Sequence, residues 1–206
     1  MTSTLVFTLF FILAFVFILK DSIIVVKQQE AIVIESLGKF SRILYAGLHF
    51  IVPFVDAPRR INRIEKCITR DGHTYYAPVY SKIVDLKETV YDFQGQNIIT
   101  KDNVKINVNV ILDYQIIDPK KAVYQVENLP EAIKKLTQTN LRNLVGQLSL
   151  DEALVSRDVI NDELREIFGK VADKWGIKVN RVELQDIIPP ESIQQSMEKE
   201  KKTEQE

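Results

Sequence analysis

Two residues whose side chains could act together, Cys67 and His73, lie six positions apart. A thiol and an imidazole form a nucleophile–base pair only when they are in contact and a third group orients the imidazole. Asp71-Gly72 between them is a hairpin turn signal, so they belong to the two sides of a predicted hairpin. We favour a structural Cys and a solvated His, and keep a membrane-tethered thiol enzyme using this pair as the less favoured alternative.

Other chemical groupings are missing from the sequence. It has no P-loop, dinucleotide-binding, serine-hydrolase, zinc-protease or C-x-x-C pattern. One Cys and two His are too few for a closed His/Cys metal site. With 27 basic and 28 acidic residues, the chain has no positive field to attract nucleic acid. We therefore expect no catalysis, cofactor, metal or nucleic-acid partner.

The only basic cluster is Arg59-Arg60 with Arg63. Beside a bilayer such a cluster can contact anionic headgroups. A solvated face is the simpler interpretation.

The most apolar stretch runs from Leu5 to Leu19 and reads LVFTLFFILAFVFIL. As a helix, residues 3–19 would span about 25 Å, against a hydrocarbon core of about 30 Å. A cleaved signal peptide, the main alternative, would have basic residues before the run and a small-residue cleavage site after it. Neither is present, so we predict a retained membrane anchor over residues 1–22, with the lipid bilayer as partner. Its anchoring residues would be Leu5, Phe7, Phe10, Phe11, Phe15, Phe17 and Leu19.

Charge predicts the orientation of this anchor. No basic residue precedes the run, whereas Lys20, Lys27 and Lys39 follow it. The positive-inside rule then predicts a single-pass protein with a cytoplasmic body. The lack of an Arg- and Ser-rich transit peptide favours a bacterial inner (cell) membrane over a mitochondrial one.

A second apolar segment, His49 to Val55, reads HFIVPFV. We favour a buried or edge strand that ends at Pro53. The alternative is a shallow second contact with the membrane through Phe50, Ile51, Val52, Pro53 and Phe54.

Alternating apolar residues predict strands in the first half of the body. Two short strands are expected within residues 22–39, with Gly38 at a turn, and a hairpin over about residues 65–86. From Val104 to Ile116 the alternation is nearly complete, which predicts a strand with one buried face.

The period then changes to that of helices. Asn128 and Ser149 occupy N-cap positions with Glu three residues later, and Gly176 can end a third helix. Residues 177–188 return to strand character, and Pro189-Pro190-Glu191 opens a polar helix. Strands followed by helices predict an α+β domain over residues 23–186, and residues 187–206 begin a C-terminal helix or coiled coil.

Several strings, in this order, resemble the stomatin/prohibitin/flotillin (SPFH, band 7) superfamily. They are Lys27-Gln-Gln-Glu-Ala31, Gly38-Lys-Phe40, Gly47-Leu48, Pro53-Phe54, Ile99-Thr-Lys-Asp-Asn-Val104, Leu136-Thr-Gln-Thr139, Leu141-Arg142, Leu150-Asp-Glu152, Trp175-Gly-Ile-Lys-Val179 and Pro189-Pro190-Glu191. The hairpin insert and residues 180–186 are most similar to the stomatin-like (paraslipin) branch. Two features depart from the family: its usual Pro-Gly-Leu turn reads Ala46-Gly47-Leu48, and its long coiled coil is nearly absent, as in a fragment or a truncated member.

The resemblance implies an SPFH domain, an antiparallel-rich sheet packed with helices, behind a transmembrane helix. It also implies a non-enzymatic homo-oligomeric scaffold, a ring or cage that organises a membrane microdomain and its proteases or channels. A one-to-one regulatory subunit of a membrane protease or channel is the alternative.

Overall fold

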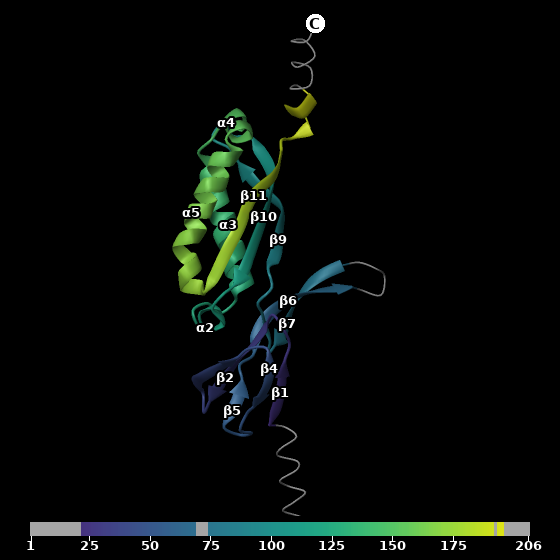
Figure 1. Cartoon of the computed structure of the whole chain (residues 1–206). Helices are drawn as coiled ribbons and strands as arrows, with labels where there is room; N and C mark the ends of the chain where they lie inside the picture. Colours follow the sequence, from purple (N-terminus) through teal and green to yellow (C-terminus); the bar gives the residue numbers. More distant parts are fainter. Residues whose placement is uncertain (1–21, 69–73, 192, 196–206) are drawn as a thin grey trace, which may run out of the picture. The chain divides into compact units, whose positions relative to one another are not determined.

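The computed structural model describes residues 22–68, 74–191 and 193–195 (Figure 1). The chain divides into two compact units, with the boundary between Lys87 and Glu88. Strands and helices together confirm the α+β class. Within the described ranges, no helix is both long and apolar enough to cross a membrane. The predicted anchor residues Leu5, Phe7, Phe10, Phe11, Phe15, Phe17 and Leu19 lie outside those ranges.

The N-terminal unit is built from short strands. They are β1 (Ile23–Val26), β2 (Glu30–Ser36), β3 (Lys39–Leu44), β4 (Gly47–Phe50), β5 (Asp56–Pro58), β6 (Ile61–Ile68), β7 (Thr74–Ser81) and β8 (Val84–Asp85). Strand β2 pairs with β3, β5 and β8, while β1 pairs with β4 and β6 with β7, all antiparallel. The two strands predicted within residues 22–39 are confirmed as β1 and β2.

A small apolar core holds this unit together. Val26 of β1, Ile32 and Ile34 of β2 and Leu44 of β3 are buried in one cluster, and the half-buried Ile51 packs against it. The β-branched residues of β1 and β2 suit a pleated, buried surface, which explains why these runs form strands.

The predicted hairpin is present with different limits. It begins at Ile61 and ends at Ser81, not at about residues 65 and 86. Val84 and Asp85 instead form β8 and pair with Ala31 and Glu30 of β2. Local sequence could not distinguish these residues from the end of the hairpin, because their partner strand is more than 50 residues away.

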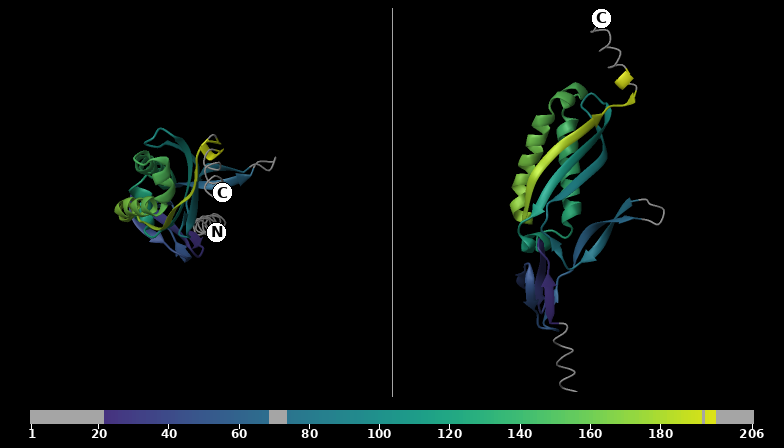
Figure 2. Two further views of the ribbon diagram at one scale, coloured as in Figure 1. Left: turned by 90° about the horizontal axis from the view of Figure 1, so that it is seen from above. Right: turned by 45° about the vertical axis from the view of Figure 1, so that its right-hand side comes forward.

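The C-terminal unit is a three-stranded antiparallel sheet with helices on one face (Figure 2). Its strands β9 (Thr89–Ile99), β10 (Lys105–Ile116) and β11 (Ile177–Ile188) lie in the order β11-β10-β9. Its helices are α2 (Pro119–Tyr124), α3 (Leu129–Gly146), α4 (Leu150–Val155) and α5 (Arg157–Trp175). Alternate residues of β10 are fully buried against the helices, and Phe168 of α5 lies in the same core.

The predicted helix ends are confirmed. The Asn128 side chain accepts a hydrogen bond from the Glu131 N–H, and Ser149 and Glu152 form a reciprocal capping box. Gly176 ends α5 in the left-handed conformation, with φ of 67°. After β11, the Pro190 carbonyl accepts hydrogen bonds from the N–H groups of Ile193 and Gln194, which is the start of the predicted polar helix.

Candidate membrane-contact site

One end of the N-terminal unit exposes large apolar side chains that a water-soluble surface does not require. Phe50 is 64% exposed, Val52 58% and Phe54 95%. We call the whole set the apolar end: Ile23, Val25, Leu48, Phe50, Val52, Phe54 and Val55. Isolated exposed apolar residues are ordinary, but a contiguous group marks a surface for a membrane or a partner.

The register of β1 and β4 places four of these residues on one face. Ile23 lies opposite Phe50, and Val25 lies opposite Leu48. All four are exposed, while Val26 at the end of β1 is buried. Cross-strand partners project to the same side of a sheet, so this two-stranded ribbon has one uncovered apolar face.

Beyond β4 the chain forms a tight loop, contrary to our preferred prediction of a strand ending at Pro53. Strand β4 ends at Phe50, and the Val52 carbonyl accepts hydrogen bonds from the N–H groups of Val55 (3.3 Å) and Asp56 (2.9 Å). Phe54 sits at the tip with φ of 71°. A left-handed conformation is unfavourable for a residue with a Cβ and persists only where the surroundings enforce it.

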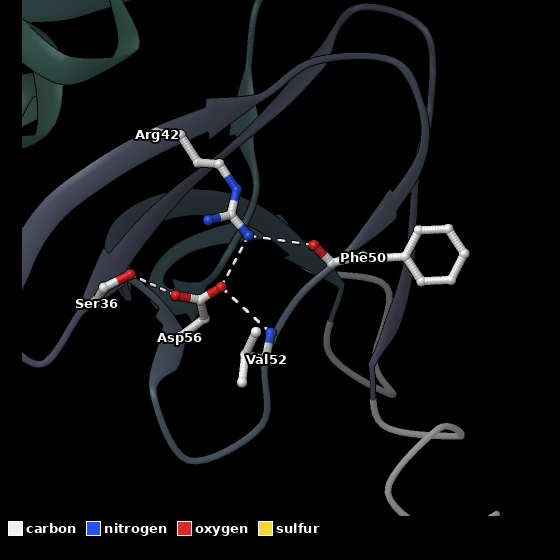
Figure 3. Close-up of polar contacts among 5 residues, drawn as sticks. All are labelled: Ser36, Arg42, Phe50, Val52 and Asp56. Atoms are coloured by element: carbon white, nitrogen blue, oxygen red, sulfur yellow. Dashed lines mark hydrogen bonds and ion pairs between the residues drawn. The ribbon is translucent and has the colours of Figure 1, made fainter.

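The enforcement comes from Asp56, whose side chain is 4% exposed (Figure 3). Its Oδ2 accepts hydrogen bonds from the Val52 N–H (3.2 Å) and from Arg42 Nη2 (2.8 Å), and its Oδ1 accepts one from the Ser36 hydroxyl. Arg42 Nη2 also donates to the Phe50 carbonyl at 3.1 Å. A polar network centred on the buried Asp56 carboxylate therefore fixes the backbone of the loop that carries the exposed Val52 and Phe54.

These contacts lower the pKa of Asp56. The largest cause is the hydrogen bond from Ser36, and further contributions come from the Val52 N–H and from Arg42; burial alone would raise the pKa. Each of these groups favours the ionised carboxylate. Asp56 therefore stays charged and the loop stays tethered at neutral pH.

The apolar end adjoins the start of the described chain. The Ile51 N–H donates a hydrogen bond to the Ser22 carbonyl at 2.8 Å. Only two residues separate Ser22 from Leu19, the last residue of the predicted anchor. Even fully extended, the chain from Leu19 to Ser22 spans about 10 Å.

The five residues predicted for a second membrane contact differ in their exposure in the structure. Phe50, Val52 and Phe54 are exposed, whereas Ile51 packs on the core and Pro53 is half-buried. The exposed residues Leu48, Phe50, Val52 and Phe54 occupy every second position, but positions 51, 53 and 55 are also apolar, so no alternation in the sequence identified the exposed set. Sequence reasoning missed Leu48 and the matching face of β1, because their cross-strand pairing was not predicted.

Within its described ranges, the structure does not bring the other candidate residues together into a site. Cys67 lies on β6, opposite Tyr75, and His73 lies outside the described residues, so the thiol–imidazole pair stays a prediction. Arg59 forms an ion pair with Glu35 at 3.4 Å, which gives one member of the basic cluster a structural contact. Among the residues that the structure describes, no group of three or more His, Cys, Asp or Glu could hold a metal ion.

Residues 24–206 match the family described as SPFH domain / Band 7 family. The chain is 38% identical to a stomatin homolog of Pyrococcus abyssi, over 96% of this chain and 64% of that protein. It is 37% identical to a stomatin homolog of Pyrococcus horikoshii, over 100% of this chain and 69% of that protein.

An uncharacterized protein of Methanothermobacter thermautotrophicus is also 37% identical, over 97% of this chain and 56% of that protein. The chain thus spans about half the length of several curated relatives that it matches. The match over residues 24–206, together with these identities, shows that the chain belongs to the SPFH domain / Band 7 family.

Proposed function

We propose that this protein is a membrane-anchored, homo-oligomeric scaffold whose apolar end rests in the bilayer surface beside its anchor. Residues 1–22 hold the chain in the membrane as a single pass, with the body on the cytoplasmic side. The body performs no catalysis and arranges neighbouring membrane proteins, such as proteases or channels, by assembling with further copies.

One observation supports this proposal above the others: the segment that carries exposed Phe50, Val52 and Phe54 is hydrogen-bonded through the Ile51 N–H to Ser22, where the predicted anchor joins the body. An anchor in the bilayer would hold Ser22 at the membrane surface. The apolar end would then lie within about 10 Å of the headgroups without any further rearrangement. Insertion of these aromatic and aliphatic side chains into the bilayer surface would cost little conformational entropy, because the loop that presents them is already ordered.

The free energy of inserting these side chains shows whether the apolar end could bind a membrane without the anchor. Full burial of one Phe or Val side chain is favourable by about 1.5–3 kcal/mol, and shallow insertion recovers part of that. Three such side chains resemble a single acyl chain, which gives marginal, reversible binding with a constant of about 10⁴ M⁻¹. The apolar end therefore orients an anchored body and does not replace the anchor.

The test is vesicle flotation of the body that begins at Ser22, at millimolar lipid. We expect a measurable fraction of this body to float. The triple variant Phe50→Ser/Val52→Ser/Phe54→Ser should remain with the unbound protein.

A matched control replaces three exposed apolar residues of the other unit, Val155→Ser/Val159→Ser/Ile188→Ser. This control should float as the unaltered body does. Flotation that the first triple leaves unchanged, or that the control abolishes equally, would contradict the proposed site.

A further inference from the structure

The tight turn between β2 and β3 lies beside the loop of the apolar end. Ser36, the last residue of β2, pairs with Asp56 of β5. The next residue, Leu37, donates a hydrogen bond from its N–H to the Val55 carbonyl at 3.0 Å. Leu37 is itself 81% exposed. Two neighbouring turns, and not one loop alone, therefore present large apolar side chains at this end of the N-terminal unit.

The backbone of Leu37 is unfavourable for a leucine. Ser36 and Lys39 pair across the hairpin, so its two turn residues are Leu37 and Gly38, with φ of 50° and 80°. A two-residue turn with both residues in the left-handed region favours Asn-Gly or Asp-Gly. Phe54, at the tip of the neighbouring loop, also has a left-handed backbone. Two exposed apolar side chains held in this conformation indicate a contact outside the folded unit.

Basic side chains border these two turns. Lys39 begins β3 directly after the turn and is exposed. The side chain of Arg42, three residues further along β3, is 42% exposed. Both of its described hydrogen bonds use Nη2, to the Phe50 carbonyl and to Asp56 (Figure 3). Nη1 and Nε of the same guanidinium are therefore able to donate to a further acceptor.

The acidic residues at this end leave that basic charge exposed. The Asp56 side chain is 4% exposed and bonded to Arg42, and Glu35 forms its ion pair with Arg59 at 3.4 Å. The stretch between Glu35 and Asp56 contains no other Asp or Glu. The exposed charges beside the two turns are consequently those of Lys39 and Arg42, next to side chains that are apolar.

We propose that the turns at Leu37 and Phe54 enter the bilayer surface together, and that Lys39 and Arg42 bind the phosphate groups of anionic lipids. A guanidinium can donate to two phosphate oxygens at once, and the lysine supplies a mobile ammonium. Exposed basic side chains next to inserted apolar ones favour an anionic bilayer over a zwitterionic one. The inference names the lipid class, and it rests on the proposed function for the position of the apolar end at the membrane.

The test identifies the lipid beside the Leu37 turn in the full-length protein. In a Trp175→Phe background, Leu37→Trp gives a single indole at this turn. The protein is reconstituted into vesicles of equal parts phosphatidylcholine and phosphatidylglycerol, and only one of the two lipids carries bromine. One basic residue favours anionic lipid by about fivefold, so brominated phosphatidylglycerol should quench at least about twofold more than brominated phosphatidylcholine. Sodium chloride at about 1 M should remove the difference, because it shortens the Debye length to about 3 Å.

A matched pair of lysine variants assigns this preference to the proposed site. Lys39→Gln should remove at least about half of the excess quenching by phosphatidylglycerol. Lys27→Gln makes the same change at an exposed lysine that follows the opposite end of β1 from the Ile23–Phe50 pair, and it should leave the excess unchanged. Lys39 is the better position for this comparison, because Arg42→Gln would also break the bond to Asp56.

Each other outcome overturns a stated part of the account. Equal quenching by the two brominated lipids, or an excess that Lys27→Gln removes as fully as Lys39→Gln does, would overturn the recognition of anionic lipid and leave the membrane contact standing. Absence of quenching at Leu37→Trp, when Phe54→Trp in the same background is quenched, would overturn the entry of the second turn. Absence of quenching at both positions would overturn the proposed function as well.

Discussion

Two stretches of this chain place apolar residues at every second position, and they differ in whether those residues are buried. In β10, Ile106, Val108, Val110 and Leu112 are 0% exposed. Between Leu48 and Phe54, the alternate residues are mostly exposed, up to 95% for Phe54. The side chains are of similar type in both stretches, so the difference lies in what covers them.

Strand β10 is covered by α3 and α5, whose apolar faces complete a core. The segment from Leu48 to Phe54 contacts the polar groups of Asp56 and Arg42, and none of the described residues buries the side chains of Leu48, Phe50, Val52 and Phe54. An apolar segment therefore predicts that some of its side chains leave water, but not whether protein or lipid covers them. The predictions below test that contrast, from the largest effect to the smallest.

The largest expected difference between the two regions is the loss of stability when a large apolar side chain is removed. Phe168 is fully buried in the C-terminal unit, and Phe168→Ala should lower the free energy of unfolding by about 3–5 kcal/mol. Phe54→Ala removes the same side chain from an exposed site and should change it by less than about 0.5 kcal/mol. Urea unfolding measures both, and a large loss of stability from Phe54→Ala would show that this side chain is covered by protein.

The close approach of the end of α5 to the Asp118 backbone in the C-terminal unit depends on Gly176. A Cβ at this position would lie 2.5 Å from the Asp118 carbonyl oxygen, and the residue has a φ of 67°. Gly176→Ala should therefore destabilise the protein by about 2–4 kcal/mol. The control, Gly169→Ala within α5, meets nothing within 4 Å and should stabilise by about 0.5–1 kcal/mol. Equal melting temperatures for the two variants would contradict this account of Gly176.

The loop that presents the apolar end depends on Asp56. Asp56→Ala leaves the Val52 N–H and the Ser36 hydroxyl without their partner, and should cost about 1–3 kcal/mol. The loop should also become sensitive to limited proteolysis near Phe54. Glu127→Gln, at an exposed carboxylate, is the control and should leave both stability and proteolysis unchanged.

Protonation of Asp56 in acid should also weaken the hydrogen bonds of this loop, with a smaller loss of stability than the Asp56→Ala substitution. The pKa of Asp56 is lower in the folded protein than its ordinary value of 3.8, chiefly because of the Ser36 hydrogen bond. Its stabilisation is therefore fully present above that value and is lost as the pH falls through the folded pKa. The difference in stability between the native chain and Asp56→Ala should shrink below pH 3.8; a difference that stayed constant in acid would exclude the carboxylate as its source.

Sequence reasoning succeeded where local signals decide structure. The caps at Asn128, Ser149 and Gly176 and the strand before them follow from residue types a few positions apart. It was less successful where distant pairing decides: Val84 joins β2 and not the hairpin, and Ile51 turns into the core between two exposed neighbours. The network of Asp56 with Ser36 and Arg42 was not predicted, because it joins residues up to 20 positions apart that no motif connects.

The most direct test of the central claim is the depth of Phe54 in a bilayer. In a Trp175→Phe background, Phe54→Trp gives the full-length chain a single indole at the tip of the loop, and Val159→Trp gives a control on exposed α5. The proteins are reconstituted into vesicles with phosphatidylcholine brominated at different depths. We predict that shallow bromines quench the fluorescence of Phe54→Trp and leave that of Val159→Trp unchanged. Equal lack of quenching in both would show that the apolar end does not enter the membrane.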